Sequence, residues 1–290
     1  MDAFPEYACE YALRLAKRSR RFAAQVFEPR ARRRADPSDA RYSADPFGEL
    51  GASAKEKGLK QRFPDRVLVM TTRRCFMHCR HCTRQGLLGE ADAVETPTDL
   101  ARCVEYVKAH PKVRDVLLSG GDVLALGDRE VMRFVNAFAA LPQVEVVRVC
   151  TRALCANPER VTRRLARALG RSKKVWVNTQ FNCADEVTAE ARAAAALLVD
   201  AGVPVSCQTV LLKGVNDSAA EMLRLFRALS AARIRPYYVF MCDPVKGVGR
   251  FRVPLAKARR IERACAEAVG GLAMPRFVMD VPGAKRKLPI

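Results

Sequence analysis

The sequence predicts an α/β fold, namely a partial (open) parallel β/α barrel of about six βα units, preceded by an N-terminal helical extension. Three observations support this prediction. Short apolar runs of strand length alternate with longer segments in which apolar residues recur at helical spacing. The links between them are short, which is typical of parallel strands joined by helices outside the sheet. Six such units and one last strand fall short of the eight that close a barrel, so we expect an open sheet.

The first part of the chain is expected to precede this barrel. From Pro5 to about Val26, apolar residues recur near helical spacing with arginine and lysine between them, which predicts a helix. The basic run Arg30–Arg34 and the Pro-, Ser-, Asp- and Gly-rich stretch to Gly58 are typical of a solvated linker. We therefore divide the chain into an extension, residues 1–61, and a barrel domain, residues 62–290.

The alternation of strands and helices begins after the extension. The expected strands are Val67–Thr71, Asp115–Ser119, Val144–Thr151, Lys174–Phe181, Val203–Leu211, Arg235–Met241 and Arg276–Asp280. The expected helices are Thr98–Ala109, Arg129–Leu141, Pro158–Leu169, Thr188–Ala201, Ser218–Ala231 and Pro254–Val269. Thr98 and Ser218 are suited to cap their helices, and Pro158 is suited to a first turn.

Composition narrows the class of protein. With 290 residues, 49% of them hydrophobic, the chain can bury a large core, and no apolar run reaches the length of a membrane span. Met1 is not followed by a secretion signal, so a cytoplasmic protein with mostly reduced cysteines is expected. The net charge of +20 would suit an anionic partner, but aromatic residues do not interleave with the basic ones, so nucleic-acid binding is the minor alternative.

A short loop after the first strand carries the strongest chemical signal. Cys75, Cys79 and Cys82 follow C-x3-C-x2-C spacing. Three thiolates this close can hold three irons of a four-iron cluster and leave the fourth iron open for a ligand. A zinc site completed by His78 or His81 is the alternative, although structural zinc usually has four ligands in two pairs. A disulfide is not favoured, because it would join two of the three cysteines in this loop and leave the third unpaired.

Polar residues recur where the expected strands end, which is the edge at which α/β barrels place their active sites. This pattern predicts a lined cavity. After the cysteine loop, the residues at this edge are Ser119-Gly120-Gly121-Asp122, Thr151-Arg152, Asn178–Asn182, Gln208, Asp243 and Asp280.

Several of these residues have an ordinary structural explanation when each is taken alone. Gly120 and Gly121 allow close backbone approach to a ligand, or simply a turn. Arg62 and Arg66 could clamp a phosphate, or lie on the surface. The carboxylates at Asp243 and Asp280 suit a cationic group, but aspartate is also common in turns. Lys287 could form a covalent bond with pyridoxal phosphate, or belong to a basic tail.

Taken in order, the motifs resemble those of a known family. The three cysteines, with His81 at the ring position before the last, resemble the radical S-adenosylmethionine enzymes. Nearly the whole barrel resembles one branch of them, the lysine 2,3-aminomutase family. The motifs that carry this resemblance are Arg62–Arg66, Cys79–Arg84, Leu117–Asp122, Gln208–Leu212, Arg235–Tyr238 and Cys242–Asp243 with Phe251–Arg252.

The resemblance implies an isomerase that converts L-lysine to β-lysine by 1,2-amino migration, with a 4Fe-4S cluster, S-adenosyl-L-methionine and pyridoxal 5′-phosphate as cofactors. It implies that the three cysteines bind the cluster, that Arg84 grips the substrate carboxylate and that Lys287 carries the pyridoxal phosphate. Asp243 and Asp280 would bind the distal ammonium group. The remaining cofactor-binding residues would be Arg62, Arg66, His81, Ser119, Gly120, Gly121, Asp122 and Gln208.

The chain departs from the family pattern in three places. Ala284-Lys285-Arg286 replaces a run of glycines before Lys287, so Lys285 is a competing amine. Gln180 and Cys183 stand where the family tends to have histidines, and the printed chain ends at Ile290, short of the extension used between subunits. Three alternatives stay open: another substrate such as arginine, loss of pyridoxal phosphate, or a basic nucleic-acid-binding protein with structural zinc. The partners implied are an electron donor such as flavodoxin or ferredoxin, and a homo-oligomer.

Overall fold

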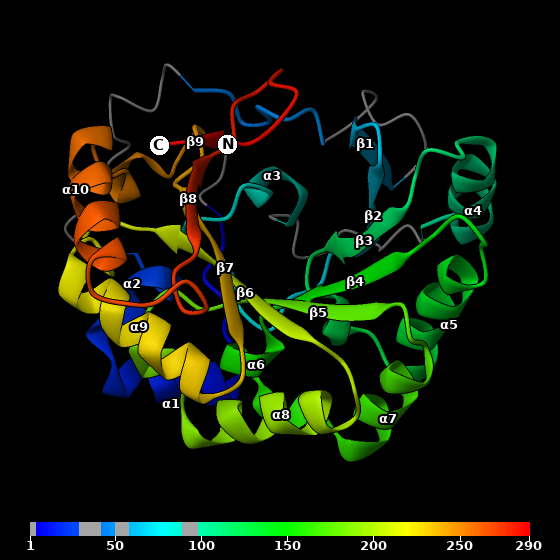
Figure 1. Ribbon diagram of the computed structural model, residues 1–290, viewed down its shortest axis with the longest axis horizontal. Coiled ribbons are helices and arrows are strands. Elements are labelled where there is room, and N and C mark those ends of the chain that lie inside the picture. The colour runs from blue at the N-terminus through cyan, green and yellow to red at the C-terminus, as the bar shows by residue number, and fades with distance from the viewer. Residues whose placement is uncertain (1–3, 29–41, 50–57, 89–97) are drawn as a thin grey trace.

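The computed structural model describes residues 4–28, 42–49, 58–88 and 98–290. Within these ranges a single curved sheet organises the chain, and its nine strands follow one another in sequence order (Figure 1). Strands β2 to β8 are parallel, while β1 and β9 pair antiparallel at the two edges. β1 and β9 do not pair with each other, so the sheet stays open and the prediction of a partial barrel is confirmed.

The seven expected strands all form, with ends that differ by no more than two residues from the expected ones. They are β2 (Arg66–Thr72), β3 (Asp115–Gly120), β4 (Val146–Thr151), β5 (Val175–Gln180), β6 (Val205–Leu211), β7 (Arg235–Met241) and β8 (Arg276–Met279). The sequence did not predict the two edge strands, β1 (Leu59–Phe63) and β9 (Leu288–Pro289). Their short, charged or proline-containing sequences lack the apolar alternation that marks a half-buried strand.

Helices cover the outer face of the sheet, as right-handed βαβ crossovers require (Figure 1). The crossover helices are α4 (Leu100–Ala109), α5 (Asp128–Ala139), α7 (Arg163–Arg171), α8 (Ala189–Asp200), α9 (Ala219–Ala231) and α10 (Leu255–Ala266). The shorter helices are α3 (Gln85–Leu88), α6 (Ala153–Ala156) and the 3-10 turns η4 (Val123–Ala125), η5 (Pro158–Arg160), η6 (Ala184–Glu186) and η7 (Gly249–Phe251).

The helix caps were predicted with mixed success. Ser218 caps α9 as expected, by accepting from the backbone N–H of Glu221. Thr98 was the wrong cap for α4, because the Asp99 side chain accepts from the N–H of Arg102 and the Thr98 hydroxyl donates to the Met70 carbonyl. The helix expected from Pro158 instead divides into η5 and α7, which starts after Thr162.

The N-terminal helix forms as two pieces that belong to the barrel core. α1 (Glu10–Arg18) and α2 (Arg20–Val26) meet at Ser19, whose extended backbone breaks the helix and whose hydroxyl caps the second piece. Phe22 and Val26 are fully buried and pack in the same apolar cluster as the strands. The expected linker falls largely outside the described residues. The boundary at residues 61 and 62 stays a prediction, and β1 spans it.

The core lies between the sheet and its helices. Valine dominates the buried positions of the early strands, including Val67, Val69, Val116 and Val147, and leucine and phenylalanine of α5, α7 and α8 pack over them. Parallel strands with helices on one face and side chains filling the other need such apolar runs. In the described part of the chain, we find no helix long and apolar enough to span a membrane.

Candidate active site

A cavity of about 400 Å³ lies at the carboxyl ends of the parallel strands. Strands β2 to β7 all contribute side chains to its lining, and Asp280 directly follows β8. Every residue to which the family resemblance gives a role in the site lines this cavity, from Arg62 to Lys287, whereas Asn182 of the strand-end residues does not. The fold therefore brings the predicted site residues together, while their individual roles stay predictions.

The cysteine loop leaves the end of β2 and is held from outside the barrel by the N-terminal segment. The backbone N–H of Cys9 donates to the Phe76 carbonyl at 2.8 Å, and that of His78 donates to the Tyr7 carbonyl at 2.8 Å. Further along, the N–H of Arg80 donates to the carbonyl of Gln25 on α2 at 2.7 Å. The N-terminal extension thus fixes the path of the loop that carries the three thiols, a role that the sequence did not reveal.

Gly120 and Gly121 let the end of β3 approach the start of the cysteine loop. Gly120 has a φ of +112°, and a Cβ on it would come within 2.6 Å of the Thr72 carbonyl oxygen. A Cβ on Gly121 would come within 2.2 Å of the Arg74 carbonyl oxygen. Side chains at these positions would displace backbone, so the glycines have a packing reason here; their predicted contact with a cofactor stays a prediction.

Asp122 ties three parts of the site together. Its backbone N–H donates to the Arg74 carbonyl at 2.7 Å. Its carboxylate accepts from the Thr151 hydroxyl at 2.6 Å and from the backbone N–H of Arg152 at 2.7 Å. Burial raises the pKa of Asp122, although these hydrogen bonds oppose the shift. Asp122 therefore links the cysteine loop to the end of β4.

The two histidines near the cysteines make other contacts. His78 contacts the Pro5 carbonyl through Nδ1 at 3.0 Å and stacks on Phe4. His81 Nε2 lies 3.0 Å from the Gln180 amide nitrogen, and burial lowers the pKa of His81 well below its ordinary value. No three His, Cys, Asp or Glu side chains in the described ranges are grouped for a single metal ion. The zinc alternative would require one of these two histidines to leave its present contact, or a fourth ligand from elsewhere.

Asp280 joins two of the cations that were expected to bind pyridoxal phosphate. Arg62 contacts both its carboxylate oxygens, at 2.8 and 3.3 Å, and Lys287 Nζ lies 3.3 Å from Oδ2. Arg66 pairs instead with the adjacent Asp65 at 2.9 Å. A phosphate bound between the two arginines would have to replace these carboxylates.

Lys287, the expected cofactor lysine, lines the cavity, whereas Lys285 is exposed and does not. Burial lowers the pKa of Lys287, and the charge of Asp280 partly opposes that shift. A lysine with a lowered pKa has more of its neutral, nucleophilic form near neutral pH. Geometry therefore favours Lys287 over Lys285 as the reactive amine.

Arg84, the expected ligand of a substrate carboxylate, already holds a carboxylate of the protein. Its Nε donates to Glu49 Oε2 at 2.6 Å, and its Nη1 lies 3.4 Å from the Ser119 hydroxyl. Glu49 is only 8% exposed and lines the same cavity. No sequence pattern pointed to Glu49, because it lies in an irregular segment and its partner is 35 residues away.

Four buried polar atoms of the lining have no hydrogen-bond partner within the described part of the chain: His81 Nδ1, Arg152 Nε, Thr179 Oγ1 and Asp243 Oδ1. Such atoms are rare in folded proteins and indicate that a ligand or solvent completes them. Burial, and then the charge of Asp280, raises the pKa of Asp243 to about 7. Burial of a negative charge on Asp243 costs free energy, and a bound cation would offset that cost. Asp243 and Asp280 therefore fit a ligand that carries a positive group.

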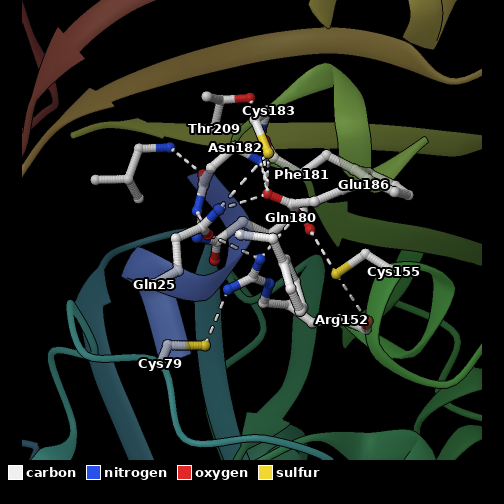
Figure 2. A network of polar contacts seen from close by, with 12 residues as sticks. Gln25, Cys79, Arg152, Cys155, Gln180, Phe181, Asn182, Cys183, Glu186 and Thr209 are labelled. Carbon is white, nitrogen blue, oxygen red and sulfur yellow. Dashed lines mark hydrogen bonds and ion pairs between the residues drawn. The ribbon is translucent and has the colours of Figure 1, made fainter. Parts of the chain in front are cut away.

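The cavity is thus lined both by three thiols and by two acids with a lysine. The thiols and open polar atoms fit an iron–sulfur cluster and a polar ligand beside it. The arginines and Lys287 fit an anionic cofactor that forms a bond with an amine, once the carboxylates on the arginines are displaced. Arg152, which the sequence marked only as a strand-end residue, donates to the Cys79 thiol, and Gln25, for which no sequence signal existed, contacts Arg152 (Figure 2).

Comparison with known proteins gives concordant results. The sequence pattern of the Radical SAM superfamily matches residues 69–226. An L-lysine 2,3-aminomutase from Fusobacterium nucleatum is 42% identical over 80% of this chain and 55% of its own length. A glutamate 2,3-aminomutase from Clostridioides difficile is 32% identical over 87% of this chain and 60% of its own. The chain therefore spans little more than half the length of these curated relatives.

The fold also has solved counterparts. The crystal structure of Streptococcus suis SuiB bound to S-adenosylmethionine aligns with a TM-score of 0.57 at 15% identity, over 75% of this chain and 51% of that one. At this identity the likeness concerns the arrangement of strands and helices.

Proposed function

Since the chain belongs to the radical SAM superfamily and is related within it to the L-lysine 2,3-aminomutases, we propose that it moves the α-amino group of L-lysine to the β-carbon. The reaction is an isomerisation, with β-lysine as the product. One observation carries the proposal: the three thiols, Arg84, two acids and Lys287 all line a single cavity. We also propose that an electron donor such as flavodoxin or ferredoxin reduces the protein, and that copies of the chain form a homo-oligomer.

The protein's own side chains would position the substrate. Arg84 would bind the α-carboxylate after releasing Glu49, with which it now pairs at 2.6 Å. Asp243 and Asp280 would bind the distal ammonium. Lys287 would hold the cofactor, and Arg62 and Arg66 its phosphate. When bound, the cluster with S-adenosyl-L-methionine supplies a carbon radical, and pyridoxal 5′-phosphate supplies a ring that carries the migrating nitrogen.

The two acids support lysine over glutamate as the substrate. The γ-carboxylate of glutamate would lie against Asp243, whose pKa is already raised to about 7 by burial and by the charge of Asp280. A third carboxylate there would add repulsion, whereas an ammonium would compensate both acids. This separates the proposed activity from the one named for the glutamate-acting relative.

A second candidate is the same radical chemistry without pyridoxal phosphate. The ion pairs of Arg62 with Asp280 and of Arg66 with Asp65 favour it, because both arginines are compensated without a phosphate. In that case Lys287 would serve as a cation in the charge cluster, and the substrate could be arginine or another cationic amino acid.

The decisive experiment is anaerobic turnover of L-lysine by reconstituted protein with S-adenosyl-L-methionine, a reductant and pyridoxal phosphate. We expect β-lysine to form, with L-glutamate inert. Protein that contains an intact cluster but yields no β-lysine would refute the substrate assignment.

Cofactor binding is tested separately by absorbance. The band of lysine-bound pyridoxal phosphate should vanish in Lys287→Ala and persist in Lys285→Ala, the exposed neighbour. A cluster-loaded protein with no such band in either form would support the second candidate.

A further inference from the structure

Arg152 lies directly beside one of the three thiols. Its Nη1 is 3.0 Å from the Sγ of Cys79, which is within hydrogen-bond distance of a sulfur acceptor (Figure 2). The residue follows the last position of β4, and its backbone N–H is fixed by Asp122 at 2.7 Å. The guanidinium thus reaches the thiol from a strand end rather than from the cysteine loop itself.

A buried carboxylate holds this guanidinium in place. Glu186 is fully buried, and its Oε2 accepts from Arg152 Nη2 at 2.9 Å. Its other oxygen accepts from the backbone N–H groups of Asn182 and Cys183, both at 3.1 Å, and from the Gln25 amide at 2.7 Å. A carboxylate with this many donors does not need the arginine to be satisfied, so it acts as a fixed anchor for it.

Gln25 connects the anchor to the cysteine loop. Its side-chain oxygen accepts from Arg152 Nη2 at 3.2 Å, and its backbone carbonyl accepts from the N–H of Arg80, next to Cys79, at 2.7 Å. The sulfur and the guanidinium are therefore positioned by the same fully buried residue of α2. The distance between them is set by the packing of the N-terminal helix against the barrel.

We propose that Arg152 is a positioning residue that stabilises the reduced state of the cluster by donating a hydrogen bond and presenting a fixed positive charge to Cys79. Arg152 lines the cavity but is assigned no contact with substrate. The proposal rests on the cluster-binding part of the proposed function, and it requires neither pyridoxal phosphate nor a lysine substrate.

The physical reason is electrostatic. One-electron reduction by a chemical reductant adds a negative charge to a cluster that its thiolates already make anionic. A cation held close to one of those sulfurs stabilises the reduced form more than the oxidised form, and low-dielectric burial strengthens the effect. The negative charge of Glu186 lies farther from Cys79 than the guanidinium does and offsets part of it. Removing the arginine should therefore lower the reduction potential, and neutralising the glutamate should raise it.

The test is an EPR-monitored redox titration of reconstituted protein without substrate, pyridoxal phosphate or S-adenosyl-L-methionine. We expect the ratio of reduced to oxidised cluster at a given potential to fall about tenfold in Arg152→Gln, which corresponds to about 59 mV for one electron. Arg152→Lys keeps the charge and should restore part of the loss. Glu186→Gln should shift the ratio in the opposite direction.

Arg160→Gln provides a matched control. Arg160 is also a half-buried arginine, paired with Asp128 at 2.7 Å and donating to two carbonyls, but it lies away from the thiols. The Arg160→Gln variant should be less stable than the parent, but the reduction potential of its cluster should be unchanged. An Arg152→Gln potential equal to that of the parent, or an equal shift in Arg160→Gln, would overturn the proposal. Glu186→Gln gives an independent answer if Arg152→Gln does not fold. If the variants shift the reduction potential as expected but the parent protein produces no β-lysine, only the proposed reaction is refuted.

Discussion

Replacing Asp243 with asparagine is expected to stabilise the cofactor-free protein, and the gain should increase with pH. The pKa of this carboxyl is raised from 3.8 to about 7, by burial first and by the charge of Asp280 second. The folded chain therefore binds the proton more tightly than the unfolded chain does. Its contribution to the free energy of unfolding falls as pH rises from 3.8 to about 7 and is constant above that range.

The size of the effect follows from the shift. One pKa unit corresponds to 1.36 kcal/mol, so the penalty above pH 7 has an upper limit of about 4 kcal/mol. At about pH 5.5 roughly half of it is present, because only part of the window between the two pKa values has been crossed. Asparagine has nearly the same shape and carries no charge. The stabilisation by Asp243→Asn should therefore be about 2 kcal/mol larger at pH 8 than at about pH 5.5.

The measurement is urea unfolding of reduced, cluster-free protein at both pH values. Asp280→Asn is the matched control, because that acid pairs with Arg62 and Lys287. Its replacement leaves two half-buried cations without their carboxylate, so it should destabilise the protein at both pH values. A stabilisation by Asp243→Asn that is equal at the two pH values, or a loss of stability at pH 8, would contradict the inference that burial and Asp280 outweigh the nearby cations Arg62 and Lys287 at Asp243.

Two further substitutions test other parts of the cavity. Glu49→Gln should leave Arg84 free for an incoming carboxylate, because a charge-assisted hydrogen bond no longer has to be broken. The Kd for L-lysine, measured by calorimetry, should then fall about fivefold. Weaker binding would instead mean that Glu49 supports Arg84. Gly121→Ala should displace the Arg74 carbonyl and reduce the iron content per chain after anaerobic reconstitution to less than about half. Gly127→Ala is the control and should bind iron normally, because a Cβ there meets nothing within 4 Å. Equal iron content in the two variants would show that the loop tolerates the shift.

The sequence allowed the barrel to be predicted because its signals are local. Each parallel strand carries its own apolar run, and its carboxyl end is marked by a polar residue such as Ser119 or Asp243. The β1 strand escaped because Leu59–Phe63 is mostly polar and only Leu59 is buried. The cap of α4 was misplaced by one residue because Thr98 and Asp99 are both capable caps, and only the contact of Thr98 with β2 decides between them.

The contacts within the site were much harder to predict than its location. Glu49 and Gln25 lie in the extension, where periodicity indicates at most a helix, and their partners are far away in sequence. Arg152 was visible at a strand end, but its position beside Cys79 depends on how β4 meets the cysteine loop. Long-range polar partners of this kind leave no spacing rule in the chain, so they require the structure.

The pattern of charges explains where the cavity can discriminate between ligands. The cations expected to bind phosphate and substrate already contact carboxylates of the protein: the pairs are Arg62–Asp280, Lys287–Asp280, Arg84–Glu49 and Arg66–Asp65. An anionic ligand group that binds one of these cations must replace the protein carboxylate that already contacts it, so the net gain in binding free energy is small. Asp243 differs, because its Oδ1 has no hydrogen-bond partner in the described ranges and its pKa is raised. A cation that binds there pairs with this carboxylate and relieves the cost of its buried charge, so the distal positive charge of the proposed lysine substrate should determine selectivity more than its carboxylate does.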